Sequence, residues 1–177
     1  MTSKLYHAAA LATKSLGVGS APQDNIIDCV QLHAGLSIAA AWIPIGGLDV
    51  ATLTANILTM YARINKFLGI SFNENIMKSI GSTLTASLTS NITLTGIATV
   101  FKWFPGIGTI TGGIVMGATV YATTISAAWI YLTAIANWAK EGKGSSNNLE
   151  SCIEDVIVQN KKQINDIIQN EEATYSA

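Results

Sequence analysis

Two long uncharged stretches, separated by a single lysine, constrain this chain more than any other feature. No residue from Ser79 to Phe101 or from Trp103 to Ala139 carries a charge, and Lys102 alone lies between them. Each stretch is long enough to cross a bilayer, which takes about 20 mostly apolar residues in a helix. The chain must therefore bury a large apolar surface, either inside protein or in lipid.

A proline and glycine turn stands at the junction of these stretches, in the sequence Trp103-Phe104-Pro105-Gly106-Ile107-Gly108. Proline lacks an N–H and glycine tolerates positive φ, so one helix should end here and another begin. A similar turn occurs earlier, in Trp42-Ile43-Pro44-Ile45-Gly46-Gly47. We therefore predict an all-α fold with two consecutive helical hairpins, at about residues 23–69 and 73–140, whose turns contain Pro44, Gly46, Gly47, Pro105, Gly106 and Gly108.

The pattern of apolar residues and breaks divides the chain into four parts. Residues 1–20 form an N-terminal amphipathic segment, with a helix over residues 3 to 16 that ends at Gly17. Residues 21–141 form the apolar hairpin body, residues 142–148 a polar linker, and residues 149–177 an acidic C-terminal helix and tail. Within the body, helices are expected from about Gln23 to Trp42, Leu48 to Leu68, residue 73 to Phe101, and Thr109 to Lys140, with Gly69 as a C-cap.

Glycines recur at the start of the last body helix, which is also the most apolar. Gly108 with Gly112, and Gly113 with Gly117, form two small-xxx-small pairs that let another helix approach closely. These glycines serve either to pack the two arms of the hairpin together or to form a dimer contact between molecules. We take Gly112, Gly113 and Gly117 as helix-packing positions.

Tryptophan and lysine residues mark both ends of the second hairpin. Lys102 and Trp103 lie at one end, and Trp138 and Lys140 at the other. An amphipathic ring and a long ammonium side chain both favour the interface between a membrane and water. We predict that these four residues are interface anchors, and the alternative is a soluble core whose ends carry aromatic residues.

The C-terminal segment has a different character. Apolar residues recur there every three or four positions among Asn, Gln, Asp and Lys, from Leu149 to Ile168. We expect one amphipathic helix, interrupted on its apolar side near Asn160, that packs back on the body or dimerises.

Charge and chemistry exclude several functions. Ten basic residues against eleven acidic ones, without a basic stripe, argue against nucleic-acid binding. Cys29 and His33 share a helical face at a metal-ligand spacing, but two ligands do not make a site, and free thiols are expected at Cys29 and Cys152. No catalytic constellation, phosphate loop or cofactor motif is present, so we expect neither an enzyme nor a small-molecule substrate.

The turns and their surroundings resemble a bacterial domain family of unknown function. The similarity rests on Ile43-Pro44-Ile45-Gly46-Gly47-Leu48-Asp49, Tyr61-Ala62-Arg63-Ile64, Leu68-Gly69-Ile70-Ser71 and Pro105-Gly106-Ile107-Gly108, and it covers about residues 34 to 137. That family occurs downstream of Era-like small GTPase domains and in some inner-membrane proteins. The resemblance implies membrane association and, by extension, a GTPase partner in trans. This chain departs from the pattern in its Phe67-Leu68-Gly69 and has no GTPase domain.

These observations predict a non-catalytic, membrane-associated helical protein that acts as an anchor, a scaffold or a coupling partner. Its partners would be the lipid bilayer and either another protein or a second copy of itself. Because two helices separate the proline turns, both turns should lie on one side, with Arg63, Lys66, Lys78, Lys140 and Lys143 opposite. The positive-inside rule then places both termini in the cytoplasm, at a bacterial inner membrane. A pore-forming or toxin-like hairpin protein and a soluble helical-bundle adaptor are the alternatives.

Overall fold

A computed structural model of the chain describes residues 3–41, 50–72, 74–81, 110–142 and 147–176. Those residues form helices and short connections and contain no strand, which confirms the predicted all-α fold. A further helical segment covers residues 74–81. The labelled helices are α1 (Ser3–Leu16), α2 (Pro22–Ala41), α3 (Val50–Leu68), α6 (Ile110–Lys140), α7 (Asn147–Gln159) and α8 (Lys161–Ser176).

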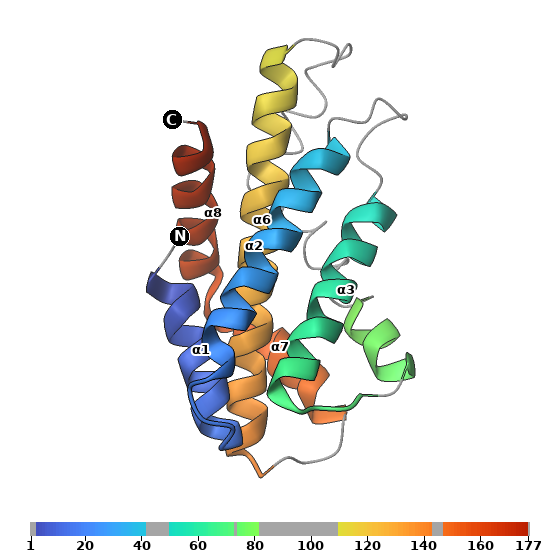
Figure 1. Cartoon of the computed structure of the whole chain (residues 1–177), viewed down its shortest axis with the longest axis vertical. Coiled ribbons are helices and arrows are strands. Elements are labelled where there is room, and N and C mark those ends of the chain that lie inside the picture. The colour runs from blue at the N-terminus through green and yellow to red at the C-terminus, as the bar shows by residue number, and fades with distance from the viewer. Residues whose placement is uncertain (1–2, 42–49, 73, 82–109, 143–146, 177) are drawn as a thin grey trace.

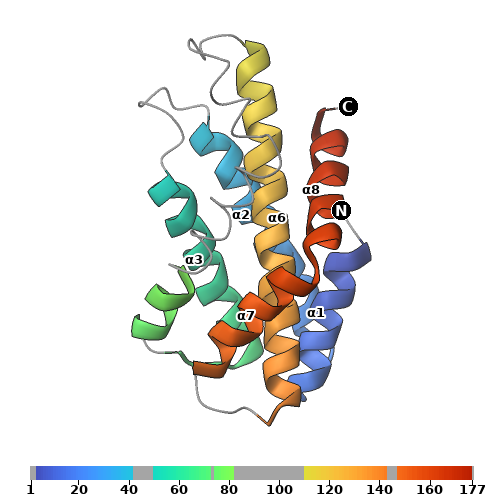
Figure 2. The same ribbon diagram turned by 180° about the vertical axis from the view of Figure 1, so that it is seen from behind.

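The longest helix, α6, is the axis of the bundle (Figure 1). It contacts every other labelled helix. Antiparallel α2 and α3 pack together on one side, and α1 and α8 lie along the other. Seen from behind, α7 crosses the lower half of α6 (Figure 2). The chain therefore folds around its most apolar segment.

Two helices end in the same glycine motif. After α1, Gly17 has a φ of 73°, and the Val18 N–H donates to the Thr13 carbonyl at 3.1 Å. After α3, Gly69 has a φ of 66°, and the Ile70 N–H donates to the Asn65 carbonyl at 2.9 Å. This is the hydrogen-bond pattern of a Schellman cap, which needs a residue in the left-handed region. The predicted breaks at Gly17 and Gly69 are confirmed.

The apolar part of α6 is covered by the chain itself. Gly117–Lys140 is long and apolar enough to cross a membrane, and it is the one such helix among the described residues. However, 89% of its apolar window is buried, and Ile125 near its middle is fully buried. The core helix of a soluble bundle has the same length and composition as a membrane span. The second arm of the second hairpin, expected to lie in lipid, here lies inside protein.

The C-terminal segment differs from the prediction. It forms two helices, α7 and α8, where one interrupted helix was predicted. The break falls at Asn160, whose side-chain amide donates to the Val156 carbonyl at 2.9 Å. The Asn160 backbone N–H also donates to the Val156 carbonyl, at 3.1 Å, and the apolar side resumes in a new direction on α8 (Figure 2). Both helices pack on α6, so the expected docking on the body is confirmed.

Several predicted features lie outside the described residues. These are both hairpin turns, with Pro44, Gly46, Gly47, Pro105, Gly106 and Gly108, and two of the anchors, Lys102 and Trp103.

Candidate functional site

One end of the bundle gathers the helix ends that flank the proline turns. The last residue of α2, Ala41, and the first residues of α3 and α6, Val50 and Ile110, lie at the same end (Figure 1, top). Segment 42–49 connects α2 to α3, and segment 82–109 connects residue 81 to α6; within these two segments Asp49 and Lys102 are the only charged residues. We call this the turn end.

Three lysines lie at the opposite end, together with the acidic residues Asp24 and Glu141. Lys14, Lys66 and Lys140 lie in the last turns of α1, α3 and α6. All three helices run down to this end in Figure 1. Cations near helix C-termini interact favourably with the helix dipole, which gives these lysines a structural role. The last turns of three helices are therefore each completed by a lysine at this end.

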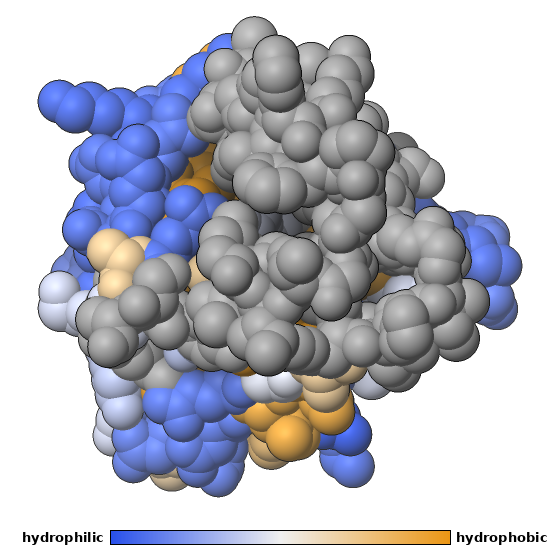
Figure 3. Space-filling view, turned by 90° about the horizontal axis from the view of Figure 1, so that it is seen from above, coloured by the Kyte–Doolittle hydropathy of each residue, from blue (hydrophilic) through white to orange (hydrophobic). Residues whose placement is uncertain are grey.

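The outer face of α2 exposes an apolar patch. Leu32 is 51% exposed and Leu36 is 48% exposed, with Gly35 and Ala39 exposed beside them. Figure 3 looks onto the turn end, and apolar surface shows along the side where α2 lies. We name Leu32, Gly35, Leu36 and Ala39 the α2 patch. It lies in the half of α2 that leads to the turn end.

A hydrogen-bonded polar cluster links α2, α3 and α6. The Asn56 amide on α3 donates to the His33 carbonyl at 2.9 Å and to Ser37 Oγ at 2.7 Å. Asn56 Oδ1 lies 2.7 Å from His33 Nδ1. Ser37 Oγ in turn lies 2.8 Å from Thr124 Oγ1 on α6. A single asparagine therefore holds three polar groups of the neighbouring helix.

This geometry fixes the form of His33. Because Asn56 Nδ2 donates to a carbonyl, its Oδ1 can only accept, so His33 Nδ1 carries the proton in that bond. His33 is 2% exposed, and its other ring nitrogen, Nε2, is buried and has no hydrogen-bond partner among the described residues. Buried polar atoms are usually paired, so this orphan marks a polar site within the core.

A second polar contact lies farther along the same interface. Tyr61 on α3 and Tyr131 on α6 stack with ring centroids 3.8 Å apart. The Tyr61 hydroxyl donates to the Ala127 carbonyl, and the Tyr131 hydroxyl donates to Asn65 Oδ1, each at 2.8 Å. With the Asn56 cluster, these bonds make what we call the polar seam, the contact of α6 with α2 and α3.

The two cysteines are free and buried, as expected. Burial raises the pKa of the Cys29 thiol, and the nearby Arg63 charge offsets only part of the rise. Burial and the negative charges of Glu141 and Asp155 raise the pKa of the Cys152 thiol. A raised pKa suppresses the reactive thiolate, so neither position has the character of a nucleophile.

The remaining predicted residues fall at different places. Gly117 is buried in α6, and Gly112 and Gly113 lie in the same helix. Trp138 is 8% exposed and packs edge-on against Phe72 with ring centroids 5.7 Å apart, while Lys140 is exposed. Their roles as packing and anchor residues stay predictions.

Comparison of the chain with protein-family models, with curated proteins and with solved structures finds no match. The resemblance over residues 34 to 137 therefore rests on its short motifs alone.

Sequence reasoning missed the polar seam. Buried residues of α3 recur as Leu53, Ile57, Met60, Tyr61, Ile64 and Leu68, and Asn56 and Asn65 fall on the same side. A helical projection of this segment contains that signal, because two asparagines on an apolar face need partners. It does not reveal which helix supplies them.

Proposed function

We propose that this chain is a non-catalytic, membrane-associated helical protein that acts as an anchor or scaffold, with its turn end toward the bilayer. The observation that carries the proposal is the position of three helix ends and three lysines. The end of α2 and the starts of α3 and α6, next to segments whose only charged residues are Asp49 and Lys102, lie at one end, and lysines close three helices at the other. A bilayer favours this polarity, because lysines avoid its core and concentrate on the cytoplasmic side.

The α2 patch supports the same orientation. Leu32 and Leu36 are large apolar residues that a water-facing helix rarely exposes side by side, and they lie toward the turn end. A membrane surface would cover them and remove their apolar area from water. The outward face of α7 instead carries Glu154 and Asp155, which anionic headgroups repel.

The burial of α6 changes which segment is proposed to enter lipid. The part of α6 from Gly117 to Lys140 is enclosed by polar-faced helices, and those helices are poor neighbours for lipid. The uncharged stretch from Ser79 to Phe101 has a sufficient length for a membrane segment. We therefore propose a water-facing bundle attached at its turn end, with its exposed helices free to bind a protein partner. The family resemblance suggests a GTPase in trans as that partner.

The test is flotation of the purified full chain with vesicles of phosphatidylglycerol and phosphatidylcholine, followed by a carbonate wash. The double change of Leu32→Glu with Leu36→Glu should weaken vesicle binding about tenfold or more, since two leucines leave the apolar phase. The matched control is Val158→Glu, because Val158 on α7 is 65% exposed and lies outside the proposed contact. A wild-type chain that stays monomeric and never floats would overturn membrane association and favour the soluble adaptor.

A second candidate is a pore-forming or toxin-like protein, and one observation favours it. One helix, α6, is apolar enough to span a membrane, and the other helices of the bundle surround it. Such a helix can insert if the surrounding helices open on contact with lipid. Release of a trapped dye from the same vesicles separates this candidate from an anchor, which binds without leakage.

A further inference from the structure

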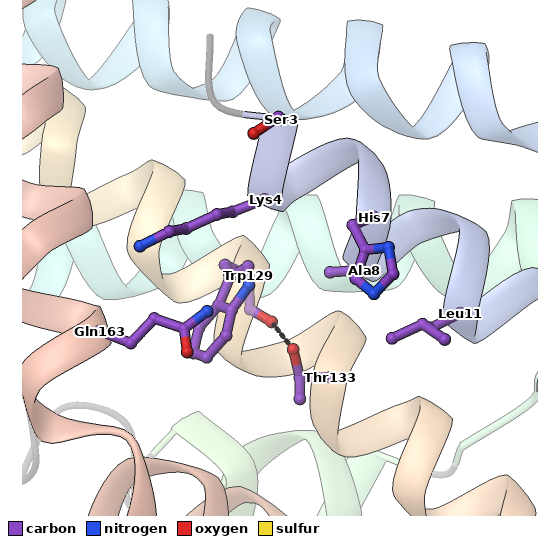
Figure 4. Close-up of a pocket in the computed structure, with 8 residues that line it drawn as sticks. All are labelled: Ser3, Lys4, His7, Ala8, Leu11, Trp129, Thr133 and Gln163. Atoms are coloured by element: carbon purple, nitrogen blue, oxygen red, sulfur yellow. Dashed lines mark hydrogen bonds between the residues drawn. The ribbon is translucent and has the colours of Figure 1, made fainter.

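A pocket of about 490 Å³ lies between α1, α6 and α8, away from the turn end and the polar seam (Figure 4). It has the size range of small-molecule sites, which are typically ~300–1,000 Å³ and are mostly apolar with a few convergent polar groups. Residues far apart in the sequence meet there, including Lys4, Trp129 and Gln163.

The walls of the pocket are apolar and include one aromatic ring. Trp129 on α6 is 5% exposed and Ala8 on α1 is 2% exposed, and Leu11 continues the apolar lining. The indole of Trp129 faces the space between the helices in Figure 4. Because Trp129 is already almost covered, the walls offer an apolar lining, which favours a ligand with an apolar body.

The polar groups of the pocket comprise one cation and several side chains that can both donate and accept hydrogen bonds. Lys4 and His7 reach in from α1, and the Gln163 amide reaches in from α8. The Thr133 hydroxyl is already used, because it donates to the Trp129 carbonyl at 2.8 Å. None of the described residues that line the pocket is acidic, and Lys4 carries the one fixed charge among them. These groups match a ligand with a single negative charge.

We propose that this pocket binds a small carboxylate with an apolar ring, with the ring against the apolar lining and the carboxylate at the Lys4 ammonium. Such a ligand would contact three helices at once and hold α1 and α8 against α6. The proposal is independent of membrane association.

The probe is indole-3-acetate, with indole-3-acetamide as its uncharged match. Saturation-transfer NMR and calorimetry on the full chain should give one saturable site. The acid should bind about tenfold or more tightly than the amide, because the Lys4 bond to a carboxylate is charge-assisted. Equal affinities, or no saturable binding of the acid at millimolar concentration, overturn the proposal.

Two variants with matched controls locate the site. Lys4→Gln should lower the affinity for the acid to that for the amide, whereas Lys14→Gln on the same helix should not. His7→Trp should fill the rim and weaken both probes about tenfold, whereas Tyr6→Trp should not, since Tyr6 is 47% exposed and lies outside the pocket. All four changes lie on α1, and thermal unfolding verifies that each variant folds. Equal effects of a variant and its control contradict the assigned site.

Discussion

The two sides of α6 make chemically different contacts with the neighbouring helices. Toward α2 and α3 it forms the polar seam, in which Asn56 and Asn65 bond to groups of other helices. Toward α1, α7 and α8 it meets mainly alanines and aliphatic residues, which we call the apolar seam, and a hydrogen bond crosses this side, from Thr119 Oγ1 to Glu172 Oε1 on α8 at 3.0 Å. The buried members of the apolar seam on those three helices are Leu5, Ala8, Ala9, Ala12, Leu149, Cys152, Ile153, Val156, Ile157, Ile164 and Ile167.

This difference determines how strongly each seam constrains the positions of the helices that pack on α6. Apolar contacts are non-directional, so helices in the apolar seam can shift or repack at modest cost. Hydrogen bonds within a buried cluster are directional, and an unpaired member costs its full desolvation penalty. The polar seam therefore fixes the register of α2 and α3 on α6, while the apolar seam supplies burial.

The substitution with the largest expected effect, Ile125→Lys, disrupts both seams at once. Ile125 is fully buried on the shared helix, so Ile125→Lys places an unpaired charge in the core. We expect a loss of about 4 kcal/mol or more in the free energy of unfolding, measured by denaturant titration. The control Val158→Lys, at a 65% exposed position, should change it by less than about 0.5 kcal/mol. A stable, wild-type-like Ile125→Lys would mean that α6 is not a core helix in water.

The polar seam should tolerate no apolar substitute at Asn56. Asn56→Leu removes three hydrogen bonds and leaves His33 Nδ1 buried without its acceptor. We expect a loss of about 3 kcal/mol in the free energy of unfolding. Thr59→Ala on the same helix is the control, since the Thr59 side chain is exposed and bonds only to its own helix. A neutral Asn56→Leu would show that the cluster does not hold α2 to α3.

The apolar seam should accept a change of shape at constant volume. Ile153 on α7 is 2% exposed, and Ile153→Leu should cost less than about 1.5 kcal/mol by the same titration. Ile153→Ala, which leaves a cavity, should cost about 2–5 kcal/mol and verifies that the position is packed. If Ile153→Leu costs as much as Asn56→Leu, the two seams do not differ in the way described.

The sequence by itself determined the all-α class and the bounds of most described helices. The helix predicted over residues 3 to 16 is α1, and the one predicted from about Thr109 to Lys140 is α6 from Ile110. The reason is that breaks depend on local chemistry. Gly17 and Gly69 can adopt the positive φ that a helix cap needs, whatever packs around them.

Only the tertiary structure decided what surrounds these helices. Hydropathy cannot distinguish a segment buried in lipid from one buried in protein, so the enclosure of Ile125 had no sequence signature. His33, considered with Cys29 as a metal-ligand pair, instead bonds to Asn56, 23 residues away. Lys4, Trp129 and Gln163 meet in one pocket for the same reason. Contacts between helices depend on which apolar faces come together in three dimensions, and local patterns do not record that choice.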